Sequence, residues 1–358
     1  MPKIMGVATA TPPHVVSQDK VIDFAKSLFG EGKHFSHLLP VYENASVETR
    51  YFSPPLDWFL ESHPFTEVND LYIKTAIELS EKVTTEVAKK SGIRTEDFDV
   101  VFFVSTTGLS TPSIDARLFN RIPMNPHIKR IPIWGLGCAG GASGMARAHD
   151  YLKAYPKHRA LIITVELCSL AFQRNDLSTT NVISTAIFGD GAAACVVFGD
   201  EVPIPPEIKS DRAIPSTISS FSTIYPNTLE VMSWRVTTEG FIVQLSRDIP
   251  SIVTSKVKGN ISEFLSGNEL TQEQIAHFIF HPGGMKVLTA YAEGLGLSME
   301  RLQNSQNTLR NFGNMSSVTI FFVLKLFLEQ TKNKSGEYGL MGALGPGFSS
   351  ELVLLQWN

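Results

Sequence analysis

The stretch Trp134-Gly-Leu-Gly-Cys-Ala-Gly-Gly-Ala-Ser-Gly144 decides the fold class, because five of its eleven residues are glycine and one is a cysteine. An apolar run at 130–134 precedes the turn and a helical pattern at 138–155 follows, so we expect a strand, a sharp turn and a helix. Glycine permits such a turn because it has no Cβ. A cysteine there, Cys138, would lie at a helix N-terminus, where the dipole and the free N–H groups favour a thiolate. The stretch therefore predicts an α/β unit that presents an activated cysteine nucleophile.

Strands and helices alternate on both sides of this turn. Apolar runs predict buried strands, while helical spacing and a serine cap at Ser17 predict helices. We expect strands at 100–105, 160–165, 192–198, 275–280 and 351–356, helices at 17–28, 69–91 and 315–330, an irregular segment at 29–64, and a glycine-rich turn flanked by strands at 338–347. Such alternation is typical of an α/β fold with buried sheets.

The spacing of the chemically important residues suggests that one unit is used twice. Thr107 and His281 end two predicted strands and lie 174 residues apart, while Cys138 and Asn314 follow glycine turns and lie 176 residues apart. The Pro-rich segment 202–215 is the predicted linker between the halves. We therefore expect a half at 1–201 that carries the nucleophile and a half at 216–358 that carries His and Asn.

Composition excludes several classes of protein. The chain has 358 residues, 43% of them hydrophobic and 18% charged, with a net charge of −4 and without a basic block, so we expect a large core and no nucleic-acid partner. The most apolar stretch, 318–328, is too short for stable membrane insertion, and a cytoplasmic location is expected. Three cysteines, Cys138, Cys168 and Cys195, argue against a disulfide framework.

His281 and Asn314 are candidate partners of Cys138. His281 begins the motif His-Pro-Gly-Gly after a predicted strand, and Asn314 lies in Gly-Asn-Met-Ser-Ser before an apolar helix. A histidinium beside a cysteine stabilises the thiolate. The N–H groups of His and Asn can also bind a thioester carbonyl as it becomes an enolate. Papain-like proteases share the Cys-His-Asn set, but their C-G-x-C-W setting is absent here.

Two further alternatives remain open from the residues alone. Gly135, Gly137 and Gly140 satisfy the dinucleotide pattern G-x-G-x-x-G, and Glu166 ends the next strand as a ribose partner, which would suit a nicotinamide oxidoreductase. An inactive binding protein with the same fold is another possibility. A metal site is not expected, because the pair His277 and His281 lies on a predicted strand without the glutamate of a metalloprotease helix.

Five ordered motifs resemble those of type III polyketide synthases of the chalcone synthase superfamily. They are GLGCAGGASG at 135–144, FGDGAAA at 188–194, HPGG at 281–284, GNMSS at 313–317 and ALGPGF at 343–348. The resemblance implies a thiolase-type αβαβα layered fold built from two duplicated halves, and a homodimer. It also implies acyl-CoA and malonyl-CoA as substrates, with no metal or redox cofactor.

The resemblance assigns roles to individual positions. Cys138 matches the acyl-carrying nucleophile, and His281 with Asn314 matches the pair that promotes malonyl decarboxylation. Phe188 matches a gatekeeping phenylalanine, and Val243 stands where plant enzymes have the second one. The remaining matches are the cavity positions Cys168, Ala171 and Ser316, the residue that reaches across the dimer, Thr111, and the coenzyme A contacts Arg50, Lys286 and Gly283.

The departures from the plant pattern predict the substrate. Most of them replace large or hydroxylated side chains by smaller or less polar ones, and an apolar wall suits an alkyl chain because each buried CH₂ contributes about 0.8 kcal/mol. The pattern is most similar to bacterial alkylpyrone synthases, which predicts a long fatty acyl starter and an alkyl-α-pyrone product. Trp234, where plant enzymes have a small residue, argues the other way. Chalcone-type and alkylresorcinol products are the alternatives.

Overall fold

The computed structural model describes residues 1–30, 39–176, 178–206, 208, 213–329 and 333–358. Within them, nine strands form one hydrogen-bonded series in the order β11-β12-β13-β8-β1-β7-β6-β4-β5. The bounds are β1 Lys3–Ala10, β4 Val100–Val104, β5 Lys129–Ile133, β6 Arg159–Leu167, β7 Asp190–Phe198, β8 Pro215–Ile224, β11 Ile275–Phe280, β12 Tyr338–Gly345 and β13 Ser349–Trp357. A single register pair, Lys3 with Ser216, joins β1 to β8.

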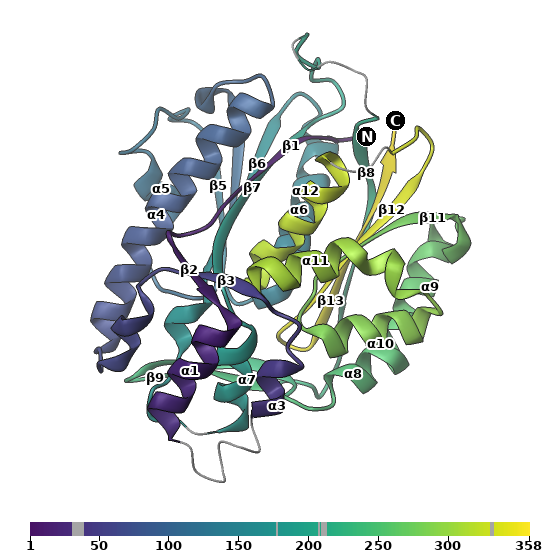
Figure 1. Ribbon diagram of the computed structural model, residues 1–358. Coiled ribbons are helices and arrows are strands. Elements are labelled where there is room, and N and C mark those ends of the chain that lie inside the picture. The colour runs from purple at the N-terminus through teal and green to yellow at the C-terminus, as the bar shows by residue number, and fades with distance from the viewer. Residues whose placement is uncertain (31–38, 177, 207, 209–212, 330–332) are drawn as a thin grey trace.

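Helices divide this series into layers (Figure 1). One outer layer covers the β1–β7–β6–β4–β5 part, two helices lie centrally between the two parts, and a second outer layer covers the β8–β13–β12–β11 part. The first outer layer is α4 Phe65–Lys90 and α5 Ile114–Leu118; the central pair is α6 Gly140–Ala154 and α12 Thr319–Glu329; the second outer layer includes α8 Ile249–Ile252, a π-turn Val253–Val257, α9 Lys258–Gly267 and α10 Met285–Leu295. The result is the predicted αβαβα arrangement.

Smaller elements gather at one end of these layers (Figure 1). They are α1 Gln18–Phe29, α3 Leu39–Glu43, α7 Thr179–Ile187, the pair β2 His14–Ser17 and β3 Thr49–Phe52, the pair β9 Met232–Thr237 and β10 Gly240–Leu245, and the 3-10 turns η1 Leu56–Leu60, η3 Gly137–Ala139, η4 Cys168–Ala171 and η8 Ser316–Val318. Helix α11, Gln303–Phe312, leads into η8. The turns η2 Thr95–Asp97, η6 Gln272–Gln274 and η7 Met299–Leu302 lie elsewhere.

Both parts of the series repeat one pairing pattern. Strand β4 is parallel to β6, β6 antiparallel to β7, and β7 antiparallel to β1. In the same way β11 is parallel to β12, β12 antiparallel to β13, and β13 antiparallel to β8. The first part adds β5 at its edge. The division at 201 and 216 stays a prediction, and residues 207 and 209–212 of the expected linker lie outside the described residues.

Several predicted elements differ from the structure at their ends. The helix expected at 69–91 begins at Phe65, and the helix expected at 315–330 begins at Thr319, with a 3-10 turn before it. The segment 29–64, expected to be irregular, contains α3, β3 and η1. Most of the stretch expected as a turn at 338–347 is strand β12. No helix in the described parts of the chain is long and apolar enough to cross a membrane.

Close contact of α6 with η8 and with β4 depends on glycine. A Cβ at Gly141 would lie 2.3 Å from the carbonyl oxygen of Ser317, and one at Gly140 would lie 2.6 Å from Val104. Lys325, in the otherwise apolar α12, donates from Nζ to the hydroxyl of Thr9 at 3.0 Å. The glycine-rich turn therefore lets elements of the two halves meet directly behind Cys138.

Candidate active site

Cys138 lies in the 3-10 turn η3, immediately before α6. Gly137 has φ +46°, and a Cβ there would lie 2.9 Å from the ring of Pro346, so glycine is required. The N–H of Gly137 donates to the Thr106 hydroxyl at 3.2 Å. The predicted strand–turn–helix unit is confirmed, and Cys138 stands at the N-terminal end of a 15-residue helix.

Glu166 does not have the role that a dinucleotide site requires. Its carboxylate is fully buried and accepts hydrogen bonds from the N–H groups of Thr106 (2.9 Å) and Thr107 (3.1 Å) and from the hydroxyl of Ser317 (2.6 Å). Burial raises its pKa to about 7, against the effect of these donors. Ser317 comes from the second half, and the buried carboxylate is bonded to protein donors and has no exposed surface for a ribose hydroxyl. The oxidoreductase alternative is therefore wrong.

His281 follows β11 and is buried, with 4% of its surface exposed. Its backbone N–H donates to the carbonyl of Gly342 at 2.9 Å, but neither ring nitrogen has a hydrogen-bond partner among the described residues. Buried polar atoms are normally paired, so an unpartnered imidazole indicates a position for a ligand. Burial lowers the pKa of His281 to about 3.

Asn314 is hydrogen-bonded to the end of α7, to the first residue of η8 and to the loop after His281. Its backbone N–H donates to the carbonyl of Ile187 at 2.7 Å, and its own carbonyl accepts from the N–H of Gly189 at 3.1 Å. Its Oδ1 accepts from the N–H of Ser316 at 2.8 Å, and its Nδ2 donates to the carbonyl of Gly283 at 3.0 Å. Asn314 therefore lies two residues before η8, whose N-cap is Met315, and also reaches the loop that carries His281.

The electrostatics correct one expectation about Cys138. Burial raises the pKa of its thiol to about 11, the Glu166 carboxylate raises the pKa further, and the side chains of Ser316 and Asn314 lower it. Burial therefore favours a neutral thiol and, at His281, a neutral imidazole. The sequence had suggested a histidinium beside a thiolate, but each group taken alone favours its uncharged form here.

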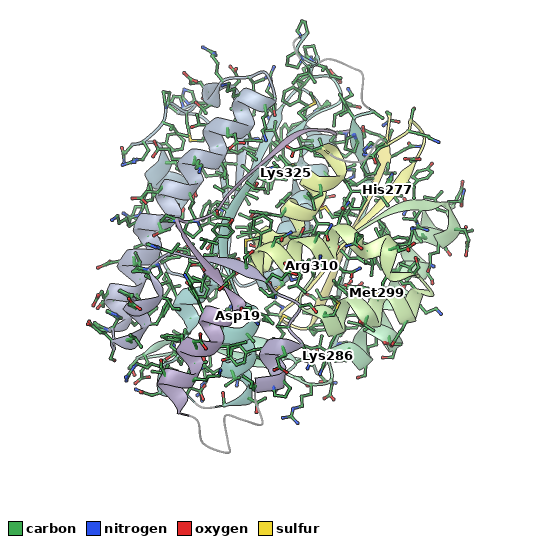
Figure 2. The ribbon with its side chains drawn as sticks, viewed as in Figure 1. Asp19, His277, Lys286, Met299, Arg310 and Lys325 are labelled. Carbon is green, nitrogen blue, oxygen red and sulfur yellow. The ribbon has the colours of Figure 1, made fainter. Side chains whose placement is uncertain are left out.

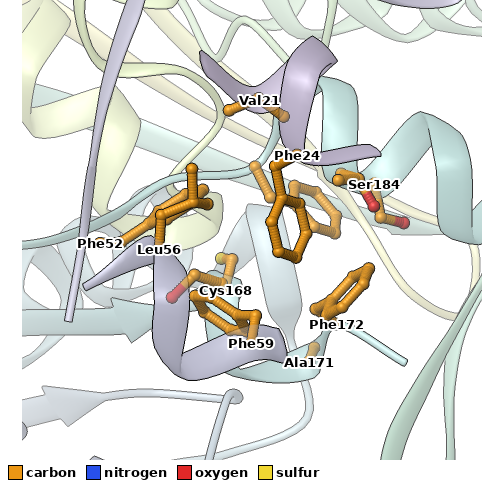
Figure 3. A pocket seen from close by; sticks show the side chains of 12 residues that line it. Val21, Phe24, Phe52, Leu56, Phe59, Cys168, Ala171, Phe172 and Ser184 are labelled. Atoms are coloured by element: carbon orange, nitrogen blue, oxygen red, sulfur yellow. The ribbon is translucent and has the colours of Figure 1, made fainter. Parts of the chain in front are cut away.

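A narrow apolar pocket lies beside three of the predicted cavity residues, Cys168, Ala171 and Phe188 (Figure 3). The cavity within it has a volume of about 30 Å³. Its other lining residues are Val21, Phe24, Phe52, Leu56, Phe59, Ser169, Phe172, Ser184 and Thr185. Sequence reasoning missed the aromatic wall from β3 and η1, because it regarded that segment as irregular. Ser316 is placed beside Cys138 instead of in this pocket.

Phe188 and Val243, which the resemblance matches to gatekeeping positions, are neighbours of Trp234. Val243 pairs with Trp234 across the β9–β10 hairpin, and the rings of Trp234 and Phe188 lie 6.3 Å apart, tilted by 46°. All three belong to the apolar cluster that also contains Cys168. The indole therefore fills space next to the gate.

The residues that the resemblance assigns to the dimer contact and to coenzyme A do not line this pocket. Thr111 is exposed and precedes the cis-proline Pro112. Lys286 is exposed in the first turn of α10 (Figure 2), near Gly283. Arg50 has no exposed surface, and its guanidinium donates to the carbonyls of Thr185, Ala186 and Phe188 and to Gln18. The structure does not bring Arg50 to a surface where coenzyme A phosphates could reach it.

His277 does not join His281. Its Nε2 lies 2.9 Å from a carboxylate oxygen of Glu337, and its ring packs against Trp357. His277 lies near the start of β11, whereas His281 follows the end of that strand, and Figure 2 shows His277 well away from Lys286. Over the described ranges, no three His, Cys, Asp or Glu side chains are grouped so that they could hold a metal ion.

This chain is similar to known proteins over nearly its whole length. Models of the N-terminal and C-terminal domains of chalcone and stilbene synthases match residues 1–201 and 217–357. A putative chalcone synthase of Bacillus subtilis is 43% identical over 99% of this chain and 98% of its own. The alpha-pyrone synthesis polyketide synthase-like Pks18 of Mycobacterium tuberculosis is 29% identical over 98% and 90%.

A solved structure agrees with these relatives. The crystal structure of 1,3,6,8-tetrahydroxynaphthalene synthase from Streptomyces coelicolor, a bacterial type III polyketide synthase, superposes with a TM-score of 0.93 at 27% identity, covering 99% of each chain. A papain-like or oxidoreductase assignment is thereby excluded. The chain belongs to the chalcone and stilbene synthase family and is a type III polyketide synthase, an enzyme that condenses acyl and malonyl thioesters of coenzyme A.

Proposed function

We propose that this enzyme condenses a long-chain fatty acyl-CoA with malonyl-CoA and releases alkyl-α-pyrones. The observation that carries the proposal is the narrow pocket lined by Phe24, Phe52, Phe59 and Phe172 beside the gate residue Phe188. Burying an alkyl chain there contributes about 0.8 kcal/mol per CH₂, so affinity rises with chain length. The name of the relative Pks18 supports an α-pyrone product.

Loading of the starter uses Cys138 and His281. The proton of the thiol moves to the imidazole, so the thiolate and the imidazolium form together and stabilise each other although burial disfavours each alone. The thiolate attacks the thioester carbonyl of the acyl-CoA. The coenzyme A thiolate then leaves, and His281 returns the proton to it.

Decarboxylation uses His281 and Asn314. A neutral imidazole has one N–H, and the Asn314 amide has a second hydrogen beyond the one that bonds Gly283. We assign both donors to the thioester carbonyl of malonyl-CoA. When CO₂ leaves, the electron pair of the broken C–C bond passes to this oxygen as an enolate, and the two donors stabilise the developing charge.

Condensation then lengthens the chain. The enolate carbon attacks the acyl-Cys138 thioester, the Cys138 thiolate leaves, and the product returns to it for another round. After two rounds, an enol oxygen attacks the terminal thioester carbonyl, the C–S bond breaks, the thiolate leaves and takes up the enol proton, and a six-membered lactone closes. No step requires a redox cofactor. A third round of extension, followed by ring closure through a carbon–carbon bond, would give the alkylresorcinol or chalcone-type alternatives.

Coenzyme A and a second subunit complete the proposal. Lys286 lies in the first turn of α10, where the helix dipole adds to its charge, and we assign it with Gly283 to the coenzyme A entrance.

Trp134 (52% exposed) and Leu109 (41%) lie together near Thr111, since the indole N–H donates to the Gly108 carbonyl. We assign this apolar patch to a homodimer. Sedimentation velocity should show a dimer, and Trp134→Arg should give monomers; a monomeric parent protein would contradict this.

The deciding experiment is mass spectrometry of products from purified enzyme, malonyl-CoA and starters from acetyl-CoA to stearoyl-CoA, with coumaroyl-CoA included. We expect alkylpyrones from the long chains. Products only from short or aromatic starters would keep the reaction class and overturn the substrate. In parallel, Cys138→Ala should lose acyl loading and condensation but retain malonyl decarboxylation, and normal condensation by that variant would overturn the mechanism.

A further inference from the structure

Asp190 is a buried carboxylate that the mechanism above does not use. It begins β7 and has no exposed surface. Four donors converge on it. Oδ2 accepts from the backbone N–H (2.7 Å) and the hydroxyl (2.7 Å) of Ser53 and from the hydroxyl of Ser169 (2.6 Å), while Oδ1 accepts from the backbone N–H of Ser169 (2.7 Å).

These donors come from two segments that line the apolar pocket and form two of its walls. Ser53 follows Phe52 in the aromatic wall, and Ser169 follows Cys168 in η4, the wall that also contains Ala171. Asp190 is not itself among the lining residues. One side chain behind the pocket therefore holds both walls by their main chains.

A carboxylate is a costly choice for this position. Burial raises the pKa of Asp190 to about 6, and none of the ion pairs found over the described residues includes it. Neutral or apolar groups would stabilise a purely structural core at a smaller cost in desolvation free energy. What a carboxylate supplies is acceptor capacity, because its two oxygens accept from all four donors and donate nothing.

We propose that Asp190 is a positioning residue that sets the separation of the two pocket walls and thereby the acyl chains that the enzyme accepts. The part about acyl chains rests on the proposed function. The part about wall separation does not, because it follows from the hydrogen bonds alone.

Asp190→Asn tests the proposal with a nearly isosteric change. In either orientation of the amide, its nitrogen faces a backbone N–H, that of Ser169 or that of Ser53. Two donors cannot pair, so one wall loses its main-chain anchor. Ser53→Ala and Ser169→Ala each remove only one hydroxyl donor and are graded companions. Glu351→Gln is the matched control, because Glu351 is a buried carboxylate that accepts from Ser222 in the other half.

The first measurement does not depend on any acyl substrate. In a Cys138→Ala background, methyl methanethiosulfonate labels the two remaining cysteines, Cys168 in the pocket wall and Cys195 in the same strand as Asp190. We expect Asp190→Asn to speed labelling of Cys168 at least tenfold and to leave Cys195 unchanged. Equal acceleration of both cysteines means general loosening, and no acceleration means no control of the wall; either result overturns the proposal.

The second measurement compares starters. We expect Asp190→Asn to lower kcat/KM for palmitoyl-CoA about tenfold relative to acetyl-CoA, through KM, with a shift of about threefold for each serine variant and none for Glu351→Gln. An unchanged ratio in a folded Asp190→Asn variant overturns the link to chain selection. If the parent enzyme rejects long chains, the proposed function fails while the cysteine labelling still decides on the wall.

Discussion

The Nδ2 amide of Asn314 donates to the carbonyl of Gly283 at 3.0 Å and so ties the start of η8 to the loop that carries His281. The Oδ1 atom of the same amide accepts from the N–H of Ser316 at 2.8 Å, which fixes which end of the amide is the donor. The same amide lowers the pKa of the Cys138 thiol, so it also lies beside the nucleophile. Asn314 of the second half therefore links the loop of His281 to the Cys138 turn of the first half.

Asn314→Asp should separate decarboxylation from acyl loading. An aspartate has no donor for the thioester oxygen, and its carboxylate would face the Gly283 carbonyl. Loss of one donor of this kind costs about 100- to 1,000-fold in rate. We expect that loss in CO₂ release from malonyl-CoA, with acyl transfer to Cys138 retained when the intact mass is measured. Asn311→Asp, the same change at the end of α11, is the control; equal decarboxylation by both variants would refute the role.

Glu166→Gln should change how stability depends on pH. The pKa of Glu166 is raised from 4.5 to about 7, so between these values the folded protein holds a proton that the unfolded chain has lost. Stability therefore falls as the pH rises through this window, by about 3 kcal/mol in total. Glutamine does not titrate, and its carbonyl can accept from Thr106 and Thr107 while its amide donates to Ser317.

Urea denaturation at pH 5 and pH 8 measures this effect. The gain in unfolding free energy from Glu166→Gln should be about 3 kcal/mol larger at pH 8 than at pH 5. The raised pKa of Asp190 acts in both proteins and cancels in the difference. A constant difference across this range would mean that Glu166 does not titrate as its burial suggests.

The contrast between Cys138 and Arg50 shows what local sequence could establish. The glycines around Cys138 act through the backbone of their own segment, so the strand, turn and helix were predictable. The position of Arg50 depends on carbonyls at the end of α7, about 135 residues away, and its burial has no local signal. For the same reason the helix after Asn314 begins late, because Ser316 has φ +49° and Ser317 bonds Glu166 in the other half. Asp190 carried one usable signal, a charge at the start of an apolar strand.

Lys286→Ala should change substrate binding, whereas Arg50→Ala should change thermal stability. Lys286 is exposed at the start of α10, so its loss should raise KM for coenzyme A thioesters about three- to tenfold and leave kcat unchanged. Arg50→Ala removes the guanidinium donor from the carbonyls of Thr185 and Phe188, at about 1–3 kcal/mol each, and should lower Tm. Steady-state kinetics and thermal unfolding of both variants measure the difference. A KM effect from Arg50 in a fully stable protein would restore it as a coenzyme A contact.

We expect the Trp234 side chain to determine whether the enzyme prefers linear or bulky starters. Its ring lies 6.3 Å from that of Phe188 and 6.0 Å from that of Phe241, and it pairs with Val243 across the hairpin. Trp234→Ala removes the indole from beside the gate and opens space there, at a cost below the 3–5 kcal/mol typical of a fully buried aromatic because Trp234 is half-buried.

With that space open, aromatic starters should fit beside Phe188, and an alkyl chain should lose contacts. We expect kcat/KM for coumaroyl-CoA relative to palmitoyl-CoA to rise at least tenfold in Trp234→Ala, measured by product mass spectrometry. Val236→Ala, a truncation of an exposed neighbour in the same strand, should leave the ratio unchanged. If Trp234→Ala instead raises kcat/KM for palmitoyl-CoA, the alkyl chain runs past the indole, and the pocket behind Phe188 is not its binding site.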